Sequence, residues 1–219
     1  MSSRYKGVLA VHPSGDCAWY LASRQSGGTG TATPTTVEIP ITADVELNSN
    51  EPTSNKNAQN LHVGRQVVGN LFVIYRSLLF ADMSVIPSGK TITSGQLIGY
   101  CTSFSVGGQA MLLREMAQLG WNEFRATWLQ YATGLSWIHP GGDTLTDGQV
   151  PVTSPSSLGL KTFDVTGLVR NGYENRGKQF SVCMMKPEAD EGIAGYATFR
   201  DHENGFDLQP GWKLRITYQ

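Results

Sequence analysis

The stretch from Trp121 to Asp143 places the strongest constraint on how this chain can fold. Three of the 5 tryptophans of the protein lie within it, together with Tyr131, and it ends in a Pro-Gly-Gly-Asp turn. Each aromatic side chain of this kind buries roughly 150–250 Å² when it packs. The stretch must therefore cover a large apolar surface and then reverse direction. Its rings either fill a core or stack on a ligand.

Most of the remaining sequence is typical of short strands separated by turns. The chain has 219 residues, of which 40% are hydrophobic, and this is enough for one substantial core. Its 25 glycines and 10 prolines recur at short intervals among Thr, Ser and Asn. We therefore predict an all-β protein, an antiparallel jelly-roll-like β-sandwich with one or two short helical turns. Residues 82–89, which contain a proline, are interpreted as one such turn.

An N-terminal arm precedes the predicted sandwich. Residues 23–36 are rich in Gly, Ser, Thr and Pro and contain a single charge, a composition typical of a flexible or extended segment. From Val37 onward, apolar residues alternate as in a half-buried strand. We assign residues 1–36 to the arm and residues 37–219 to the sandwich domain. The arm either orders on a partner or forms a first strand and a long loop of the same domain.

Charge and cysteine content disfavour several classes of function. The chain has 17 basic and 18 acidic residues, so we expect no surface for nucleic acid or anionic membranes. No apolar run approaches the roughly eighteen residues of a membrane span, and residues 8–11 are too few for a secretory signal. Cys17, Cys101 and Cys183 are widely spaced, which favours three free thiols over disulfides or a zinc site.

Two segments allow more specific structural predictions. Residues 109–119 fit either a helix or an alternating strand, so the local pattern leaves the choice open. Asp164 is followed by Val165, Leu168 and Val169, which recur on one helical face. Because Asp is a favoured N-cap residue, we predict that Asp164 begins a helix of one to two turns.

A series of motifs is more specific together than any of them alone. In chain order they are DVELNSNEP, LHVGR, RSLLFADMSVIPSGKTITSGQLIGY, WNEFRATWLQYATGLSWIHPGGD, FDVTGLV, YATFRDHE and WKLRITY. Their order and spacing resemble the DNRLRE-type β-sandwich domain over about residues 44–218. The resemblance implies a jelly-roll-like sandwich of two antiparallel sheets and favours a strand over residues 109–119. It also implies that Trp121 and Trp128 are structural.

Trp137, His139 and Asp143 are the candidate ligand-binding residues, because they lie nearest the Pro-Gly-Gly-Asp turn. An exposed Trp137 would stack on a sugar. Asp143, Asp147 and Glu123 offer oxygen ligands of the kind that calcium takes. Acidic residues in turns, however, usually bond the nearby backbone. We therefore predict neither a metal nor a cofactor.

Catalytic signatures are missing from the sequence. The 4 histidines lie in no H-E-x-x-H motif, and the chain has no G-x-S-x-G, Walker or dinucleotide-binding pattern. His202 stands between Asp201 and Glu203, but adjacent residues on a strand point to opposite faces. We interpret this trio as part of a solvated loop and predict no catalytic residue and no enzyme activity.

The family resemblance covers two kinds of non-enzymatic protein, since DNRLRE-type domains occur in phage-like virion proteins and in secreted carbohydrate-active chains. Unpaired thiols, low charge and the lack of a signal peptide favour a structural virion protein made in the host cytoplasm. It would be a decoration, head or tail-associated component that contributes to attachment to the host surface. Its expected partners are copies of itself and other virion proteins, with Trp19 and Tyr20 at the contact. The alternative is a carbohydrate-binding module that binds polysaccharide, such as a cell-surface glycan, through exposed aromatic residues.

Overall fold

Short strands joined by turns account for most of the structure, and the predicted all-β class is confirmed. The computed structural model describes residues 10–11, 17–18, 33–57, 60–203 and 210–219. The strands from residue 35 onward are β3 (Thr35–Pro40), β4 (Ala43–Asn48), β5 (Leu61–Val68), β6 (Leu71–Asp82), β7 (Ile92–Phe104), β8 (Ala110–Met116), β9 (Gln130–Ala132), β10 (Leu135–Ser136), β11 (Thr144–Thr153), β12 (Gly159–Asp164), β13 (Gln179–Met185), β14 (Gly195–Phe199) and β15 (Lys213–Tyr218). The helical elements are α1 (Thr166–Asn175) and the 3-10 turn η1 (Glu188–Asp190).

The chain divides into two compact units, Met1–Thr33 and Pro34–Gln219. The described residues of the first unit form the antiparallel pair of β1 (Ala10–Val11) and β2 (Cys17–Ala18). Trp19 and Tyr20, the predicted partner contacts, lie outside the described residues. The second unit begins slightly before the predicted boundary, because β3 already pairs with β15 along its whole length.

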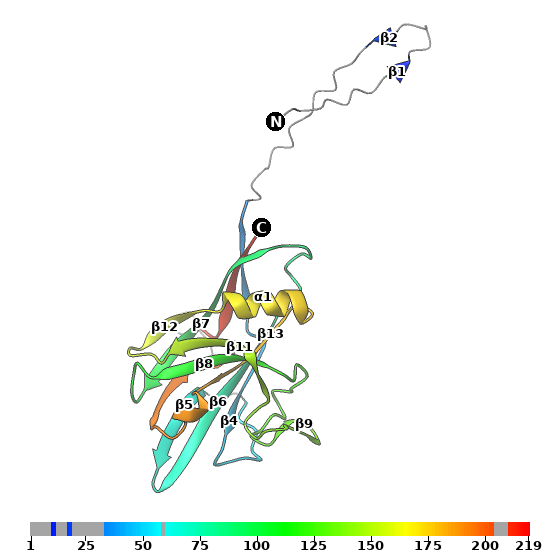
Figure 1. Cartoon of the computed structure of the whole chain (residues 1–219). Coiled ribbons are helices and arrows are strands. Elements are labelled where there is room, and N and C mark those ends of the chain that lie inside the picture. The colour runs from blue at the N-terminus through cyan, green and yellow to red at the C-terminus, as the bar shows by residue number, and fades with distance from the viewer. Residues whose placement is uncertain (1–9, 12–16, 19–32, 58–59, 204–209) are drawn as a thin grey trace. The chain divides into compact units, whose positions relative to one another are not determined.

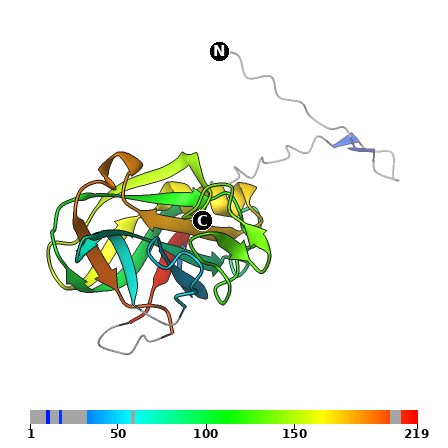
Figure 2. The same ribbon diagram turned by 90° about the horizontal axis from the view of Figure 1, so that it is seen from below.

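Apart from β9 and β10, which pair with each other in a small separate sheet, the strands of the second unit form one sheet that curls back on itself (Figure 1; Figure 2). Its order is β11-β8-β13-β6-β5-β14-β7-β15-β3, with β4 added along β6 and β12 along β7. The long strand β6 pairs with three other strands. Strands β4 and β13 pair with its C-terminal part, and β5 pairs with its N-terminal part. The result is a sandwich-like fold, in agreement with the sequence-based expectation.

The main core lies inside the curled sheet. Phe199 and Trp212 pack there with ring centroids 4.9 Å apart, and Phe163 lies 6.3 Å from Trp212. Gly99 of β7 allows this packing, because a β-carbon at its position would lie 2.4 Å from the indole ring of Trp212. The helix α1 packs against β7 and β13 and adds Leu168 to the same core.

A second core covers the opposite face of β4, β6, β13 and β8, where alternate residues of each strand point outward. On β6, for example, Leu79 faces the main core whereas Leu78 faces the second one. Residues 117–143, here termed the cover segment, close this second core with the buried rings of Trp121 and Trp137. The structural role predicted for Trp121 is confirmed, and Trp128 is half-buried against the same cluster.

Three local predictions have clear outcomes. Residues 110–116 form strand β8, as the family resemblance favours. The helix after Asp164 is longer than predicted, with 10 residues, and Asp164 stands one residue before its N-cap, accepting a hydrogen bond from the backbone N–H of Thr166 at 3.0 Å. The prediction of a helical turn over residues 82–89 is wrong, because non-helical turns follow the end of β6. Asp82 accepts a hydrogen bond there from the N–H of Ser84.

Among the described residues, no helix has the length and apolar character needed to cross a membrane.

Candidate functional site

Trp137, predicted to face a ligand, is instead a core residue. Only 5% of its surface is exposed, and its indole Nε1 donates a hydrogen bond to the backbone carbonyl of Thr127 at 2.9 Å. Its ring packs beside Tyr131, with centroids 5.3 Å apart. The cover segment places this side chain inside the second core, where its ring packs with the other apolar residues. The ring therefore offers no stacking face to a sugar, and that prediction is corrected.

Asp143 closes the turn in which it lies. Its two carboxylate oxygens accept hydrogen bonds from the backbone N–H groups of Ile138 and His139, each at 2.8 Å. The carboxylate is buried, and these two bonds engage both of its oxygens, as expected of an acidic residue that organises a turn. Of the three predicted residues only His139 faces solvent, with 83% of its side chain exposed.

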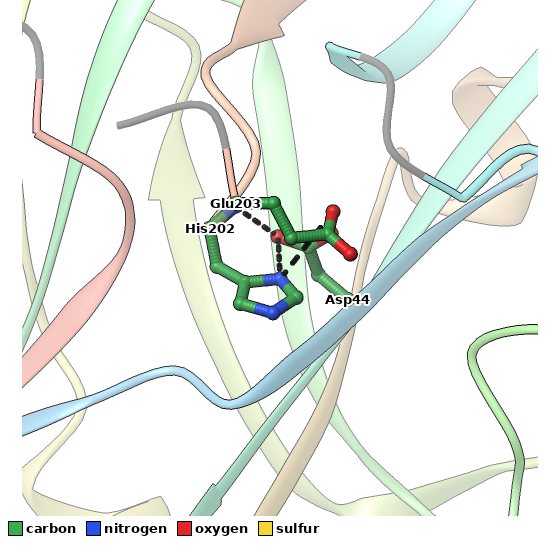
Figure 3. Close-up of side chains that lie close together, drawn as sticks. All are labelled: Asp44, His202 and Glu203. Carbon is green, nitrogen blue, oxygen red and sulfur yellow. Dashed lines mark hydrogen bonds and ion pairs between the residues drawn. The ribbon is translucent and has the colours of Figure 1, made fainter. Parts of the chain in front are cut away.

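A different cluster brings together residues that are far apart in the sequence. Asp44 lies on β4, whereas His202 and Glu203 follow the end of β14, and the three side chains point toward one another (Figure 3). The backbone N–H of His202 donates to Asp44 Oδ2 at 2.7 Å, and the imidazole Nδ1 lies 3.3 Å from the same oxygen. The carboxylate of Glu203 lies 3.9 Å from the same Nδ1.

This geometry corrects the interpretation of His202 as a residue of a solvated loop, whereas Glu203 is exposed, as that interpretation expects. The side chain of His202 is only 17% exposed. Adjacent side chains point to opposite faces only in an extended strand. Residues 201–203 follow the end of β14, so their side chains can converge on one point. Nothing in the local sequence indicates the third partner, since Asp44 is 158 residues away from His202.

Glu123 completes what we term the Asp44 cluster, which consists of Asp44, Glu123, His202 and Glu203. The backbone N–H of Asp44 donates to Glu123 Oε2 at 3.3 Å. Asn55 fixes the backbone around Glu123, because its amide group donates to the Glu123 carbonyl at 2.6 Å. Among the three acidic residues considered as calcium ligands, the structure brings only Glu123 to this cluster. Asp143 serves its own turn, and Asp147 lies on β11.

The electrostatics of the cluster follow from burial and from its concentration of carboxylates. Burial raises the pKa of the Asp44 carboxyl group, although the neighbouring His202 opposes this shift. Burial also raises the pKa of Glu123. The interaction with the Asp44 side chain raises the pKa of His202, against the effect of its own burial. Three carboxylates around one imidazole favour a positive charge at this point, either the imidazolium itself or a bound cation.

A cavity of about 450 Å³ lies between β11, β8 and α1 and contains a buried carboxylate, that of Glu115. Both oxygens of Glu115 accept hydrogen bonds from the Asn171 amide group, at 2.9 and 2.7 Å, and Arg176 lies 3.8 Å away. The carboxylate is thus fully engaged in holding α1 to β8. We assign it a structural role.

An apolar tip is the most conspicuous surface feature of the described residues. It consists of Val67 and Val68 at the end of β5 and Leu71 and Phe72 at the start of β6, each 49–62% exposed. Gly69, at φ 61°, and Asn70 form the two-residue turn between them, a connection well suited to hairpins. Figure 1 shows this hairpin, in cyan, reaching beyond the rest of the sandwich. The guanidinium of Arg65 lies 3.7 Å from the centre of the Phe72 ring.

Taken together, the curled antiparallel sheet and its two cores define an all-β, sandwich-like domain. Comparison with family models gives no match to this chain, and a search of curated proteins gives none either. The resemblance to the DNRLRE-type domain therefore stays a prediction, and any functional argument must come from the geometry of the described residues.

Proposed function

We propose that this chain is a non-enzymatic structural protein that assembles with copies of itself, as a virion component of the kind that the DNRLRE-type resemblance implies. The apolar tip carries the proposal. Four adjacent apolar side chains on a protruding hairpin expose both faces of the ribbon to water. Contiguous apolar patches of this kind usually mark contacts with other proteins.

The sheet edges support a contact through the tip rather than through strand pairing. Strand β3 lies at one end of the strand order, and among the described residues no strand pairs with its outer edge. It carries Glu38, which forms ion pairs with Lys213 and Arg215, and it ends at Pro40. Charged side chains and proline are features that keep an edge strand from pairing with other chains. At the tip, Arg65 lies over one face of the Phe72 ring, and the other three apolar side chains are exposed.

The mass of the protein in solution tests this proposal. We expect the full chain to be oligomeric by size-exclusion chromatography with light scattering. Phe72→Asp places a charge in the contact and should shift the protein toward monomer. Val85→Asp is the matched control, because Val85 is equally exposed but lies beyond the opposite end of β6, and this variant should keep the wild-type mass.

Two results would count against assembly through the tip. One is a wild-type protein that stays monomeric at a concentration of about 100 µM, where contacts of moderate affinity form. The other is an oligomer whose mass is the same in the Phe72→Asp variant. The alternative function, a carbohydrate-binding module, relied on Trp137 as the exposed aromatic residue. Its burial removes the specific observation that favoured this alternative.

A further inference from the structure

The Asp44 cluster has the composition and spacing of a metal site. One ligand atom each from Asp44, His202 and Glu203 lies within 4.8 Å of the other two. In a tetrahedral site with bonds of about 2.1 Å, two ligand atoms are separated by roughly 3.4 Å. The imidazole Nδ1 lies 3.3 Å from the carboxylate of Asp44 and 3.9 Å from that of Glu203. These separations are close to those that a common metal ion would impose.

Unpartnered buried atoms are an independent sign of a missing ligand. Asp44 has 0% of its surface exposed, yet its Oδ1 has no hydrogen-bond partner among the described residues. Buried carboxylate oxygens are nearly always satisfied, so this atom requires an explanation. Nδ1 of His202 also makes no hydrogen bond there, and neither does Oδ1 of Asn57, whose amide nitrogen lies 3.3 Å from Glu203.

We propose that Asp44, His202 and Glu203 bind a divalent transition-metal ion, of which Zn²⁺ is the best match. An imidazole nitrogen with carboxylate oxygens is a ligand set that Zn²⁺ accepts readily. Ca²⁺ takes six to eight oxygen ligands and has little use for imidazole. Asn57 and Glu123 are placed to support the site, the first through Glu203 and the second through the backbone of Asp44.

Such an ion would join two parts of the chain that meet only in the folded state, and Glu123 adds a supporting contact from a third part. Asp44 belongs to β4, His202 and Glu203 follow β14, and Glu123 belongs to the cover segment. A ligand that binds the folded chain and not the unfolded one raises stability in proportion to its concentration and affinity. The role of the ion is therefore structural, and it is independent of the apolar tip.

Calorimetric titration of the metal-free full chain with ZnCl₂, MnCl₂ and CaCl₂ tests the proposal. We expect one Zn²⁺ per chain at this site, weaker Mn²⁺ binding and no Ca²⁺ binding. His202→Gln and Glu203→Gln remove one ligand each, and each should weaken Zn²⁺ binding at least tenfold. Glu203 is partly exposed, so its variant should fold even if the His202 variant does not. His139→Gln, which changes an exposed histidine outside the cluster, should bind Zn²⁺ like the wild type.

Thermal denaturation gives a second readout, in which Zn²⁺ should raise the melting temperature of the wild type but not that of Glu203→Gln. The proposal is overturned if the wild type binds no Zn²⁺ at about 1 mM, far above the dissociation constants of structural zinc sites. Equal binding by Glu203→Gln would place the ion elsewhere and also overturn it. A preference for Ca²⁺ would exclude the class of metal proposed here.

Discussion

Burial controls the chemistry of the two cysteines that the structure describes in the larger unit. Cys183 of β13 faces the second core, and its burial raises the pKa of the thiol to about 12. Cys101 of β7 belongs to the main core, and burial raises its pKa as well. Because the thiolate is the reactive form, we expect both groups to react slowly in the folded protein at neutral pH.

Thiol labelling should show this directly. In a Cys17→Ser background, Ellman's reagent at pH 8 should modify neither Cys101 nor Cys183 in the native protein. Both should react once the protein is unfolded in guanidinium. Rapid stoichiometric labelling of the native protein would show that one of the thiols is accessible, contrary to the buried positions described here.

Asp164 gives a pH-dependent prediction. Hydrogen bonds from the side chain and backbone of Thr166 lower the pKa of this carboxyl group in the folded state. A group with a lowered folded pKa stabilises the protein above its unfolded pKa, and the contribution is lost as the pH falls through the folded pKa.

We expect Asp164→Ala to reduce the free energy of unfolding by about 0.5–1 kcal/mol at pH 7, the size of a typical hydrogen bond. The difference from the wild type should shrink as the solution is acidified below the usual aspartate range. Denaturant melts at a series of pH values measure both quantities. Asp147→Ala, an exposed aspartate on β11, is the control, and an equal loss for both variants would exclude a specific role for Asp164.

At the scale of elements, the cover segment stabilises the fold by closing the second core. Trp121 is buried in it, and its indole N–H donates a hydrogen bond to Ser181 Oγ at 3.0 Å. Phe124, only a few residues along the same segment, points to solvent with 62% of its surface exposed. The two aromatic residues therefore compare a buried and an exposed position within the same segment.

Truncation of these residues should have very different effects on stability. Trp121→Ala should lower the free energy of unfolding by about 3–5 kcal/mol, because it leaves a cavity and an unpaired Ser181. Phe124→Ala should change it by less than about 0.5 kcal/mol, as is usual for exposed positions. Urea denaturation followed by circular dichroism measures both. Similar values for the two variants would mean that the cover segment is not packed on the sheet as described.

Periodicity and turn chemistry predicted many of the strands and the presence of a helix after Asp164, because these features are encoded within a few neighbouring residues. They left residues 109–119 undecided between helix and strand, and they gave too short a helix. The burial of Trp121 was expected from the family resemblance, since the size of the ring left both a core position and a ligand-stacking position open. The inward orientation of Trp137 did not, because it depends on how residues 117–143 lie across strands that are distant in the sequence. The Asp44 cluster could not be predicted from the sequence for the same reason. Its geometry is set by strand pairing, and no pattern in the residues around His202 indicates that Asp44 lies nearby.

At the scale of the whole molecule, most neighbouring strands of the curled sheet are not consecutive in the chain. Strand β3 pairs with β15, so Thr35 lies opposite Tyr218. Strand β15 in turn lies between β3 and β7 in the strand order. The first and the last strands of the larger unit are therefore neighbours, and the layer that contains them depends on both.

This pairing has a consequence for how the protein is made. During synthesis on the ribosome, β3 emerges early and has no partner until β15 has also left the exit tunnel. The edge of β7 that β15 covers is open for the same period. Non-local pairing of this kind makes folding slow and leaves unpaired strands exposed while it proceeds. The nascent chain thus completes this layer only near the end of translation of the domain, and until then its apolar strands are candidates for binding by chaperones.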